Sequence, residues 1–222
     1  MPHTIFIDIE TLPTTDESVI AEIASNITPP GNISKAETIA AWEVEKKPAL
    51  VAQAVAKTSF DTLSGSIACI CWAMNHGFVQ AVDCRSGEGE MLIDFFDFVQ
   101  KFDSSITVYV GHNVAGFDLP FLRHRSIIHQ IKPPIHLMRA MTAKPWDSCI
   151  ADTMLMWSAD REKRVGLDRL CRAFGIPGKG DFDGSMVAET WKTDPEKVVE
   201  YCKDDVERVR AVYRRLMFQD AA

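Results

Sequence analysis

Apolar and polar positions follow two periods along the chain, which predicts both strands and helices. Residues 4–9 form a β-branched, aromatic run that ends in acids, and residues 106–110 form a second apolar run. Residues 66–73 and 78–83 predict a hairpin, because an Asn-His-Gly turn sequence separates them. A further strand is expected at residues 149–156.

Helical periodicity occupies most of the remaining chain. The predicted helices cover residues 17–24, 34–57, 89–101, 117–130, 167–174, 184–191 and 195–217. At the start of the second helix, Ser34 is a predicted N-cap and Glu37 would complete a capping box, while Pro48 should break or kink it. Strands interleaved with helices indicate an α/β fold.

Composition and charge restrict the function. Of the 222 residues, 46% are hydrophobic and 25% are charged, which is ordinary for a globular protein, and the net charge is −7. This sign argues against a protein that coats nucleic acid by neutralising phosphates, but it is compatible with an enzyme whose acids surround metal ions. No apolar run is long enough to span a membrane and no signal-peptide pattern is present, so we expect a cytoplasmic protein.

The six cysteines are scattered along the sequence and form no Cys-x-x-Cys pair. This arrangement favours buried free thiols in a reducing compartment over a zinc ribbon. We interpret Cys69-Ile70-Cys71 as alternating strand residues that pack in opposite directions rather than as metal ligands.

The first candidates for chemistry are Asp8 and Glu10, at the end of the first predicted strand. Side chains two apart on a strand point to the same face, so both carboxylates should lie at the C-terminal edge of the sheet, where α/β folds place ligand sites. Such neighbours repel one another, and a divalent cation removes this repulsion by binding their oxygens. The alternative is a strand end that simply meets solvent, because Asp-x-Glu recurs elsewhere in the chain.

Two later segments supply further acids. A glycine-containing loop joins the second apolar run to a helix with Asp118 in its first turn. Taken alone, an ordinary helix-dipole role would be the commoner explanation of Asp118. On the last helix, Tyr201 and Asp205 are four residues apart and therefore share one face, next to the buried side. A carboxylate in that position needs a compensating partner.

Together these segments resemble the motifs of the DEDD exonuclease superfamily, which has the ribonuclease-H-like fold. Asp8-Ile9-Glu10-Thr11 resembles motif I of this superfamily. The segment from Gly111-His112-Asn113 to Phe117-Asp118 resembles motif II, and Tyr201 with Asp205 resembles motif III. The tyrosine four residues before Asp205, and Glu200 where the histidine branch needs histidine, indicate the tyrosine branch. Within it, the chain is similar to the proofreading exonuclease domains of family B DNA polymerases and to related stand-alone exonucleases.

The resemblance implies an α/β, ribonuclease-H-like mixed sheet flanked by helices. Residues 1–222 would form one exonuclease domain with a helical insertion at about residues 13–64, where the family usually has a short turn. Residues 167–175 and the Gly178-Lys179-Gly180 sequence also look like the segment that precedes motif III in this group. We do not interpret that Gly-Lys as a phosphate-binding loop, because it lacks the required spacing and Ser or Thr.

The resemblance further implies phosphodiester hydrolysis with two Mg²⁺ or Mn²⁺ ions roughly 3.5–4 Å apart. Their ligands would be Asp8, Glu10, Asp118 and Asp205. Tyr201 would orient the attacking water, because a phenol with a pKa near 10 is a poor base at neutral pH. Thr11 and Leu12 are expected to hold the 3′-terminal nucleotide, and Asn113 and Phe117 the next one, although each also has a structural explanation.

Polar residues outside the four acids and Tyr201 have structural explanations as well as functional ones. His112 is expected to be a structural hydrogen-bonding residue rather than a catalyst. A local basic patch either guides the phosphates of the substrate or forms a solvated helix face. It consists of Arg161, Lys163, Arg164, Arg169 and Arg172.

We therefore expect a 3′–5′ exonuclease that releases nucleoside monophosphates from the 3′ end of single-stranded DNA. A 3′–5′ exoribonuclease is the alternative within the same chemistry, because the motifs reveal no contact with the 2′-OH. The alternative without catalysis is an inactive nuclease fold that serves as a nucleic-acid-binding or interaction module. The complete set of four acids and the tyrosine argues against it. Besides nucleic acid, the expected partner is a polymerase or a replication or repair protein that acts in trans. We expect no association with a membrane.

Overall fold

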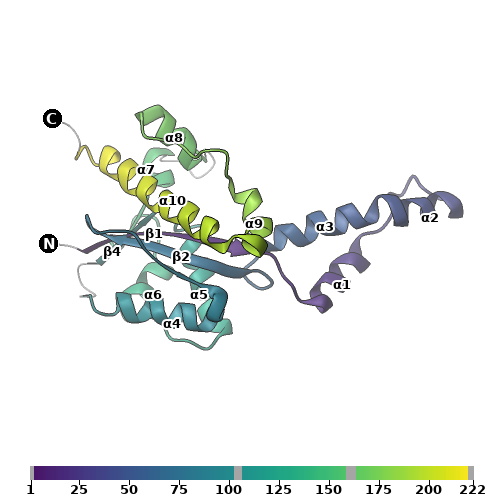
Figure 1. Ribbon diagram of the computed structural model, residues 1–222, viewed down its shortest axis with the longest axis horizontal. Coiled ribbons are helices and arrows are strands. Elements are labelled where there is room, and N and C mark those ends of the chain that lie inside the picture. The colour runs from purple at the N-terminus through teal and green to yellow at the C-terminus, as the bar shows by residue number, and fades with distance from the viewer. Residues whose placement is uncertain (1–2, 103–106, 159–163, 220–222) are drawn as a thin grey trace. The chain divides into compact units, whose positions relative to one another are not determined.

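The chain divides into two compact units. The first comprises Met1–Glu10 and Ile67–Ala222 and holds most of the sheet, whereas the second, Thr11–Ser66, is mainly helical (Figure 1). The computed structural model describes residues 3–102, 107–158 and 164–219. The insertion expected at about residues 13–64 lies inside the second unit.

Within the described residues, five strands form one mixed sheet with the order β3-β2-β1-β4-β5. The strands are β1 (His3–Leu12), β2 (Ser66–Met74), β3 (Gln80–Asp83), β4 (Thr107–Gly111) and β5 (Ile150–Asp152). Strands β1, β4 and β5 are parallel, whereas β2 and β3 form the predicted antiparallel hairpin. The parallel strands end at the same edge, so the acids of β1 face the loop that follows β4.

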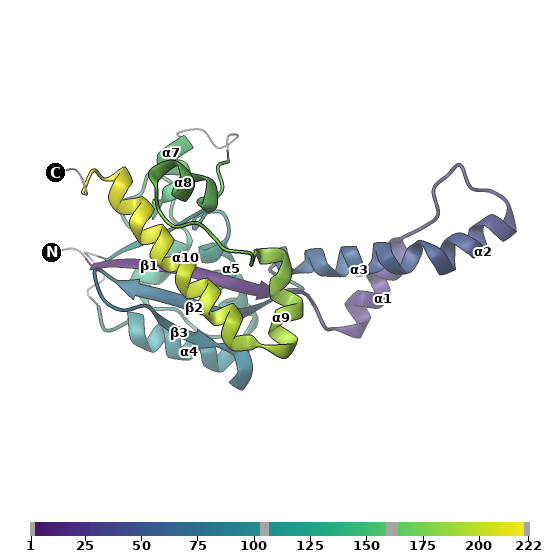
Figure 2. The same ribbon diagram turned by 45° about the horizontal axis from the view of Figure 1, so that its top comes forward.

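Helices cover both faces of the sheet. Figure 1 and Figure 2 show α4, α5 and α6 on one face and α7 and α10 on the other. Their bounds are α4 (Glu88–Val99), α5 (Asp118–Ile128), α6 (Ile135–Met141), α7 (Thr153–Ser158), α8 (Leu167–Phe174), α9 (Val187–Thr193) and α10 (Pro195–Leu216). Short 3₁₀ turns occur at Cys84–Ser86 and Gly184–Met186.

The main core lies between the sheet and helices α4 to α6. Apolar side chains of α4 that are fully or almost fully buried face inward, as the periodicity predicted: Met91, Leu92, Phe95, Phe96 and Val99. They pack with Ile5 and Ile7 of β1 and with Tyr109 of β4. Each large side chain buried in this way contributes about 1.5–3 kcal/mol. The core therefore fixes β1 and β4, the two strands that lead into the acidic motifs.

Helix α10 packs across the other face and begins where its sequence indicates. Pro195 occupies its first turn, and the Asp194 side chain accepts a hydrogen bond from Lys197 N at 3.1 Å. Val198, Val206 and Val209 are fully buried on one side of the helix. Tyr201 and Asp205 are carried at the border of this buried side, so the helix position determines where their polar groups point.

The second unit contains α1 (Glu17–Asn26), α2 (Ala36–Glu45), α3 (Lys47–Lys57) and a 3₁₀ turn at Thr58–Phe60. Pro48 lies in the first turn of α3 and separates it from α2, which confirms the predicted break. The predicted capping box is wrong, because the N-cap of α2 is Lys35 and no side chain caps the helix. Inside this unit, Thr14 N donates a hydrogen bond to Thr58 Oγ1 at 2.8 Å.

Two elements differ from the sequence prediction. The strand expected at residues 149–156 ends at Asp152, because the Asp152 carboxylate accepts hydrogen bonds from Met154 N and Leu155 N and begins helix α7 there. Helix α6 was not predicted, because only seven residues follow Pro134 before it ends. Ile106, the predicted start of β4, lies outside the described residues.

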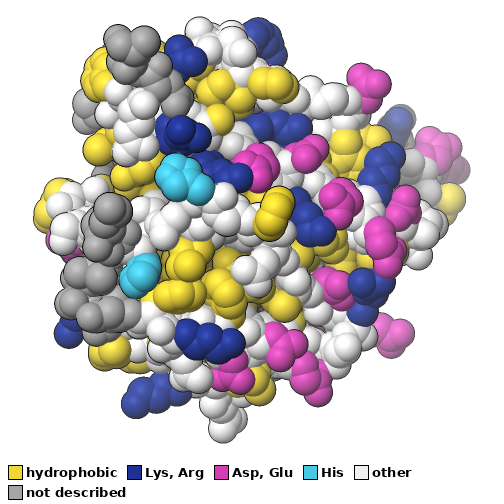
Figure 3. Space-filling view, turned by 60° about the vertical axis from the view of Figure 1, so that its left-hand side comes forward, with side chains coloured by type: hydrophobic (Ala, Val, Ile, Leu, Met, Phe, Trp, Pro, Cys, Tyr) yellow, Lys and Arg dark blue, Asp and Glu magenta, His cyan; other side chains and the backbone are white. Residues whose placement is uncertain are grey.

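The described surface and helices bear on two expectations from the sequence, namely the absence of a phosphate-coating basic surface and of a membrane-spanning helix. Figure 3 shows the side of the molecule that lies to the left in Figure 1, where acidic and basic side chains are interspersed around apolar patches. Among the residues described on this face, no continuous basic surface forms. None of the described helices has both the length and the apolar composition needed to cross a membrane.

Candidate active site

The predicted acids converge on one cleft of about 260 Å³ at the C-terminal edge of the sheet. Asp8 and Glu10 enter it from β1, Asp118 from the start of α5, and Tyr201 and Asp205 from α10. Carboxylate oxygens of Asp8, Glu10 and Asp205 all lie within 4.8 Å of one another. The structure thus brings together residues that are almost two hundred positions apart in the sequence, as the motifs predicted.

Asp118 is tied directly to the first strand. Its Oδ1 accepts a hydrogen bond from Ile9 N at 3.2 Å, so it reaches the backbone between the two acids of β1. The side chain is almost completely buried, and this burial raises the pKa of Asp118 to about 7, with the charges of Asp152 and Asp205 adding to the effect. Its position at the first residue of α5 is therefore more than a surface helix-dipole interaction.

The cleft concentrates negative charge. Burial, followed by the neighbouring carboxylates Asp118 and Asp205, raises the pKa of Asp8 well above its usual value. Burial likewise raises the pKa of Glu10, and Asp205 again contributes. Converging carboxylates with raised pKa values are a donor set suited to hard divalent cations, which bind oxygen ligands and offset the repulsion.

Lys179 is the site residue that the sequence interpretation missed. Its Nζ donates hydrogen bonds to Asp205 Oδ2 at 2.5 Å and to the Tyr201 hydroxyl at 2.6 Å. Burial alone would lower the pKa of Lys179, but Asp205 and the Tyr201 hydroxyl outweigh it and raise the pKa. The only signal in the sequence was the Gly178-Lys179-Gly180 segment, which resembled the stretch before motif III without indicating a role for the lysine.

Lys179 and Asp205 are both held from outside the cleft. The backbone N of Lys179 donates to Asp168 Oδ1 at 3.0 Å, which fixes the loop that carries the lysine. Arg208 Nη1 donates to Asp205 Oδ1 at 2.8 Å from the next turn of α10. Each oxygen of the Asp205 carboxylate thus has a cationic partner, so its orientation is set before any ligand binds.

Asp152 organises the loop of motif II. Its Oδ1 accepts a hydrogen bond from Asn113 N at 3.0 Å, and its Oδ2 accepts one from Ala115 N at 3.1 Å. Where this loop begins, a Cβ on Gly111 would lie 2.6 Å from the Cβ of Val114, so the tight turn requires glycine. Asp152 was not predicted as important, because it lay inside a segment interpreted as a continuous strand.

The four residues predicted to contact nucleotides do not all line the acidic cleft. Phe117 lines the acidic cleft and packs against Phe121, with ring centroids 5.4 Å apart. Asn113 adopts a positive φ of 64° and lines a neighbouring cavity of about 260 Å³. Thr11 and Leu12 belong to the second unit, where the Thr11 hydroxyl donates to Ser59 O at 2.7 Å.

His112 also lines the cleft, but both of its ring nitrogens are engaged. Nδ1 lies 3.0 Å from Thr153 Oγ1 and Nε2 lies 2.8 Å from Val165 O. Burial lowers the pKa of His112, which favours the neutral ring. These contacts agree with the expected structural role.

The basic patch is only partly described. Arg161 and Lys163 lie outside the described residues. Arg172 forms an ion pair with Asp168 at 2.6 Å, so its charge is already shared on the helix surface.

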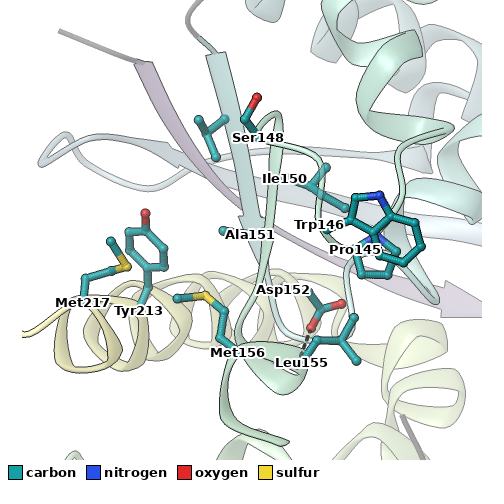
Figure 4. A pocket seen from close by; sticks show the side chains of 11 residues that line it. Pro145, Trp146, Ser148, Ile150, Ala151, Asp152, Leu155, Met156, Tyr213 and Met217 are labelled. Carbon is teal, nitrogen blue, oxygen red and sulfur yellow. Dashed lines mark hydrogen bonds between the residues drawn. The ribbon is translucent and has the colours of Figure 1, made fainter. Parts of the chain in front are cut away.

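A larger cavity of about 600 Å³ lies elsewhere, where β5 and α7 approach α10 (Figure 4). Most of its described lining is apolar or aromatic, and Figure 4 shows Trp146, Met156, Tyr213 and Met217 around it. Its one carboxylate among the described lining residues is Asp152, whose oxygens already accept backbone hydrogen bonds. Cavity size therefore does not locate the acidic chemistry in this molecule.

Comparisons with known proteins agree with this geometry. A sequence model of the family described as "Predicted 3'-5' exonuclease related to the exonuclease domain of PolB" matches residues 63–222. The match includes Asp118, Tyr201 and Asp205, whereas Asp8 and Glu10 precede it. The comparison with curated proteins gives no match.

Among solved structures, the chain is similar to the family B DNA polymerase from the hyperthermophilic archaeon Pyrobaculum calidifontis. The TM-score is 0.61 with 18% sequence identity, and the similarity covers 98% of this chain but only 25% of the polymerase. This likeness confirms the expected ribonuclease-H-like α/β fold. Exonuclease domains of this type use divalent metals, which agrees with the carboxylate cluster. On the family match, the chain belongs to the predicted 3′–5′ exonucleases related to the exonuclease domain of PolB.

Proposed function

We propose that this protein is a 3′–5′ exonuclease of the tyrosine branch, which releases nucleoside monophosphates from the 3′ end of single-stranded DNA. The observation that carries the proposal is the convergence of the four acids with Tyr201 in one cleft. DNA is favoured over RNA because the matched family is related to the exonuclease domain of a DNA polymerase. The net charge of −7 is compatible with an enzyme that contacts few phosphates.

The acids are the proposed ligands of two divalent cations, Mg²⁺ or Mn²⁺. The proposed ligand residues are Asp8, Glu10, Asp118 and Asp205. Such cations lower the pKa of a bound water and stabilise the charge that develops on the leaving oxygen. The protein contributes by fixing the oxygens beforehand, through Ile9 N on Asp118 and through Lys179 and Arg208 on Asp205.

Tyr201 would position the attacking water rather than remove its proton. Burial, followed by the charge of Asp205, raises the pKa of Tyr201, so the hydroxyl stays protonated at neutral pH. Its oxygen already accepts a hydrogen bond from Lys179 Nζ at 2.6 Å. The phenolic hydrogen is then available to hold an oxygen in the cleft, and Phe117 offers an aromatic face for a base.

The test is a gel assay on 5′-labelled single-stranded DNA and RNA of one sequence, with Mg²⁺, Mn²⁺ or EDTA. The matched variants are Asp205→Asn and Asp204→Asn, since Asp204 is the exposed neighbour of Asp205 on the same helix. We expect a ladder that shortens from the 3′ end with wild type and with Asp204→Asn, and no ladder with Asp205→Asn or EDTA.

The other outcomes change the proposal in defined ways. Full activity of Asp205→Asn would reject the metal-ligand assignment. Faster cleavage of RNA than of DNA would make the protein an exoribonuclease. Absence of cleavage with either strand and any metal would contradict the enzyme proposal and favour a nuclease fold that serves as a binding module.

A further inference from the structure

Three cysteines from two distant segments of the sequence meet beside the acidic cleft. Cys69 and Cys71 lie on β2 and Cys202 lies on α10, and their sulfur atoms are all within 4.8 Å of one another. All three side chains are fully buried. Cys69 and Cys71 point toward the same face of the sheet, so the expectation that they pack in opposite directions is wrong.

This thiol cluster (Cys69, Cys71 and Cys202) borders the acidic cleft through Asp8. Cys202 Sγ lies 3.4 Å from Asp8 O and 3.5 Å from Asp8 Oδ2. The same carboxylate lines the cleft beside Glu10 and Asp205. Asp8 therefore lies between the thiol cluster and the acidic cleft, in contact with Cys202 on one side and beside the other carboxylates on the other.

The geometry of the cluster suits a tetrahedral metal with sulfur ligands. Two sulfurs bound to one tetrahedral zinc at about 2.3 Å lie about 3.8 Å from each other, which falls within the spacing observed here. Three sulfurs and Asp8 Oδ2 supply four ligands, the number that closed zinc sites have. The three sulfurs already lie together, and a rotation of the Asp8 side chain would bring its carboxylate from Cys202 toward the other two sulfurs.

The cluster and the cleft would select different metals. Thiolates prefer soft or borderline cations such as Zn²⁺ and Cd²⁺, whereas carboxylate oxygens prefer Mg²⁺ and Mn²⁺. Binding at the cluster replaces the three S–H protons with metal–sulfur bonds and releases the protons to solvent. The two sites nevertheless share one ligand, because Asp8 borders both.

We propose that Cys69, Cys71 and Cys202, with Asp8 as the fourth ligand, form a binding site for one thiophilic divalent cation such as Zn²⁺ or Cd²⁺. Occupancy of this site takes the Asp8 carboxylate away from the acidic cleft and thereby inhibits the nuclease. The inhibition, unlike the binding itself, rests on the function proposed above.

Binding is tested by adding Cd²⁺ to the reduced full-length chain in excess Mg²⁺ and recording the ultraviolet thiolate-to-cadmium charge-transfer absorption. We expect saturation at one Cd²⁺ per chain. Affinity should fall at least about tenfold in Cys71→Ser and stay unchanged in Cys171→Ser, a buried cysteine outside the cluster. Absence of the absorption in wild type, or equal affinity in Cys71→Ser, would overturn the site.

A second measurement needs no variant and so does not depend on how a substituted chain folds. X-ray absorption at the cadmium edge of the wild-type complex should count three sulfur neighbours and at least one oxygen. A shell made only of oxygen and nitrogen would reject the cluster as the site. Neither measurement requires nuclease activity, so failure of the proposed function and failure of the metal site are distinguishable.

Inhibition is then measured as the change that one equivalent of Zn²⁺ causes in the Mg²⁺-dependent rate of each protein, relative to its own rate without Zn²⁺. Wild type and Cys171→Ser should slow by about tenfold or more, and Cys71→Ser should slow much less. Equal slowing of all three proteins would refute the inhibitory link through Asp8.

Discussion

Lys179 Nζ lies 2.5 Å from Asp205 Oδ2, so a positive charge sits inside the acidic cleft. The ammonium group occupies the side of Asp205 that faces Tyr201, and it offsets part of the repulsion among the four carboxylates. It also competes for an oxygen that would ligate a divalent cation. The lysine is therefore coupled to metal binding as well as to the orientation of the tyrosine.

Substitution Lys179→Met removes this charge while keeping a stem of similar length. In the absence of nucleic acid, we expect Mn²⁺ to bind about tenfold more tightly, equivalent to about 1.4 kcal/mol, because the competing cation is gone. Isothermal titration calorimetry measures this affinity. Lys203→Met is the control, because Lys203 pairs with Glu200 on the same helix and does not line the cleft. Weaker Mn²⁺ binding by Lys179→Met would contradict the prediction.

The acids of the cleft should destabilise the metal-free fold. Asp8 is held among other carboxylates with a raised pKa, so its charged form is less favourable in the folded than in the unfolded chain. We expect Asp8→Asn to raise the free energy of unfolding in EDTA at neutral pH by about 1–2 kcal/mol, measured by urea denaturation. Mg²⁺ should stabilise wild type more than the variant. The control Asp204→Asn should change stability by less than about 0.5 kcal/mol, and a less stable Asp8→Asn would refute the prediction.

The sequence predicted those parts of the fold whose signals are local. Residues 4–9 and 195–217 have clear strand and helix periods, and the structure places β1 and α10 there. The position of Asp8 and Glu10 at a strand end was enough to predict that they face the same edge of the sheet. The predicted end of the strand at residues 149–156 was wrong. The Asp152 side chain accepts hydrogen bonds that begin a helix there, and the pattern of hydrophobic residues does not show this helix start.

Contacts between distant segments were the least predictable part. Lys179 lies in a loop without hydrophobic periodicity, and only the folded chain shows that its ammonium group reaches Asp205 and Tyr201. The cysteines were interpreted from their spacing along the sequence, whereas β2 and α10 bring Cys69, Cys71 and Cys202 together. Such relationships depend on how the helix crosses the sheet, which no local pattern specifies.

Asp152 should control the shape of the motif II loop without entering the cleft. The substitution Asp152→Asn replaces one acceptor oxygen with an amide NH₂ group, so the N–H of either Asn113 or Ala115 loses its partner. We expect a loss of about 1–3 kcal/mol in unfolding free energy, and a lower exonuclease rate because Asp118 follows directly after this loop. Thermal and urea unfolding measure the first effect and the gel assay the second.

The matched control is Asp147→Asn, because Asp147 accepts a backbone hydrogen bond from Lys144 N at 2.7 Å in a half-exposed turn before β5. It should leave the rate unchanged. Equal stability and rate for Asp152→Asn and wild type would show that the loop keeps its shape without the carboxylate.

Glu88 should make stability depend on pH through a network outside the cleft. Its carboxylate accepts hydrogen bonds from Arg125 Nη2 at 2.7 Å and from Ile67 N at 2.8 Å. The same carboxylate lies 2.7 Å from His129 Nε2. Burial alone would raise the pKa of Glu88, but these partners outweigh it and lower the pKa. A carboxylate with a lower pKa in the folded state stabilises the fold above its unfolded pKa, and this stabilisation is lost as the pH falls through the folded pKa.

The substitution Glu88→Gln should therefore lower the free energy of unfolding at neutral pH by about 2–4 kcal/mol, because it removes the anionic half of the buried Glu88–Arg125 ion pair. The difference from wild type should shrink as the pH falls below the unfolded pKa of about 4.5, because protonated Glu88 no longer carries the charge that glutamine lacks. Urea denaturation across this pH range measures the difference. Glu90→Gln, an exposed acid in the same turn of α4, should stay within about 0.5 kcal/mol of wild type throughout. A loss in Glu88→Gln that is the same at every pH would show that packing, rather than the charge of Glu88, holds α4 against α5.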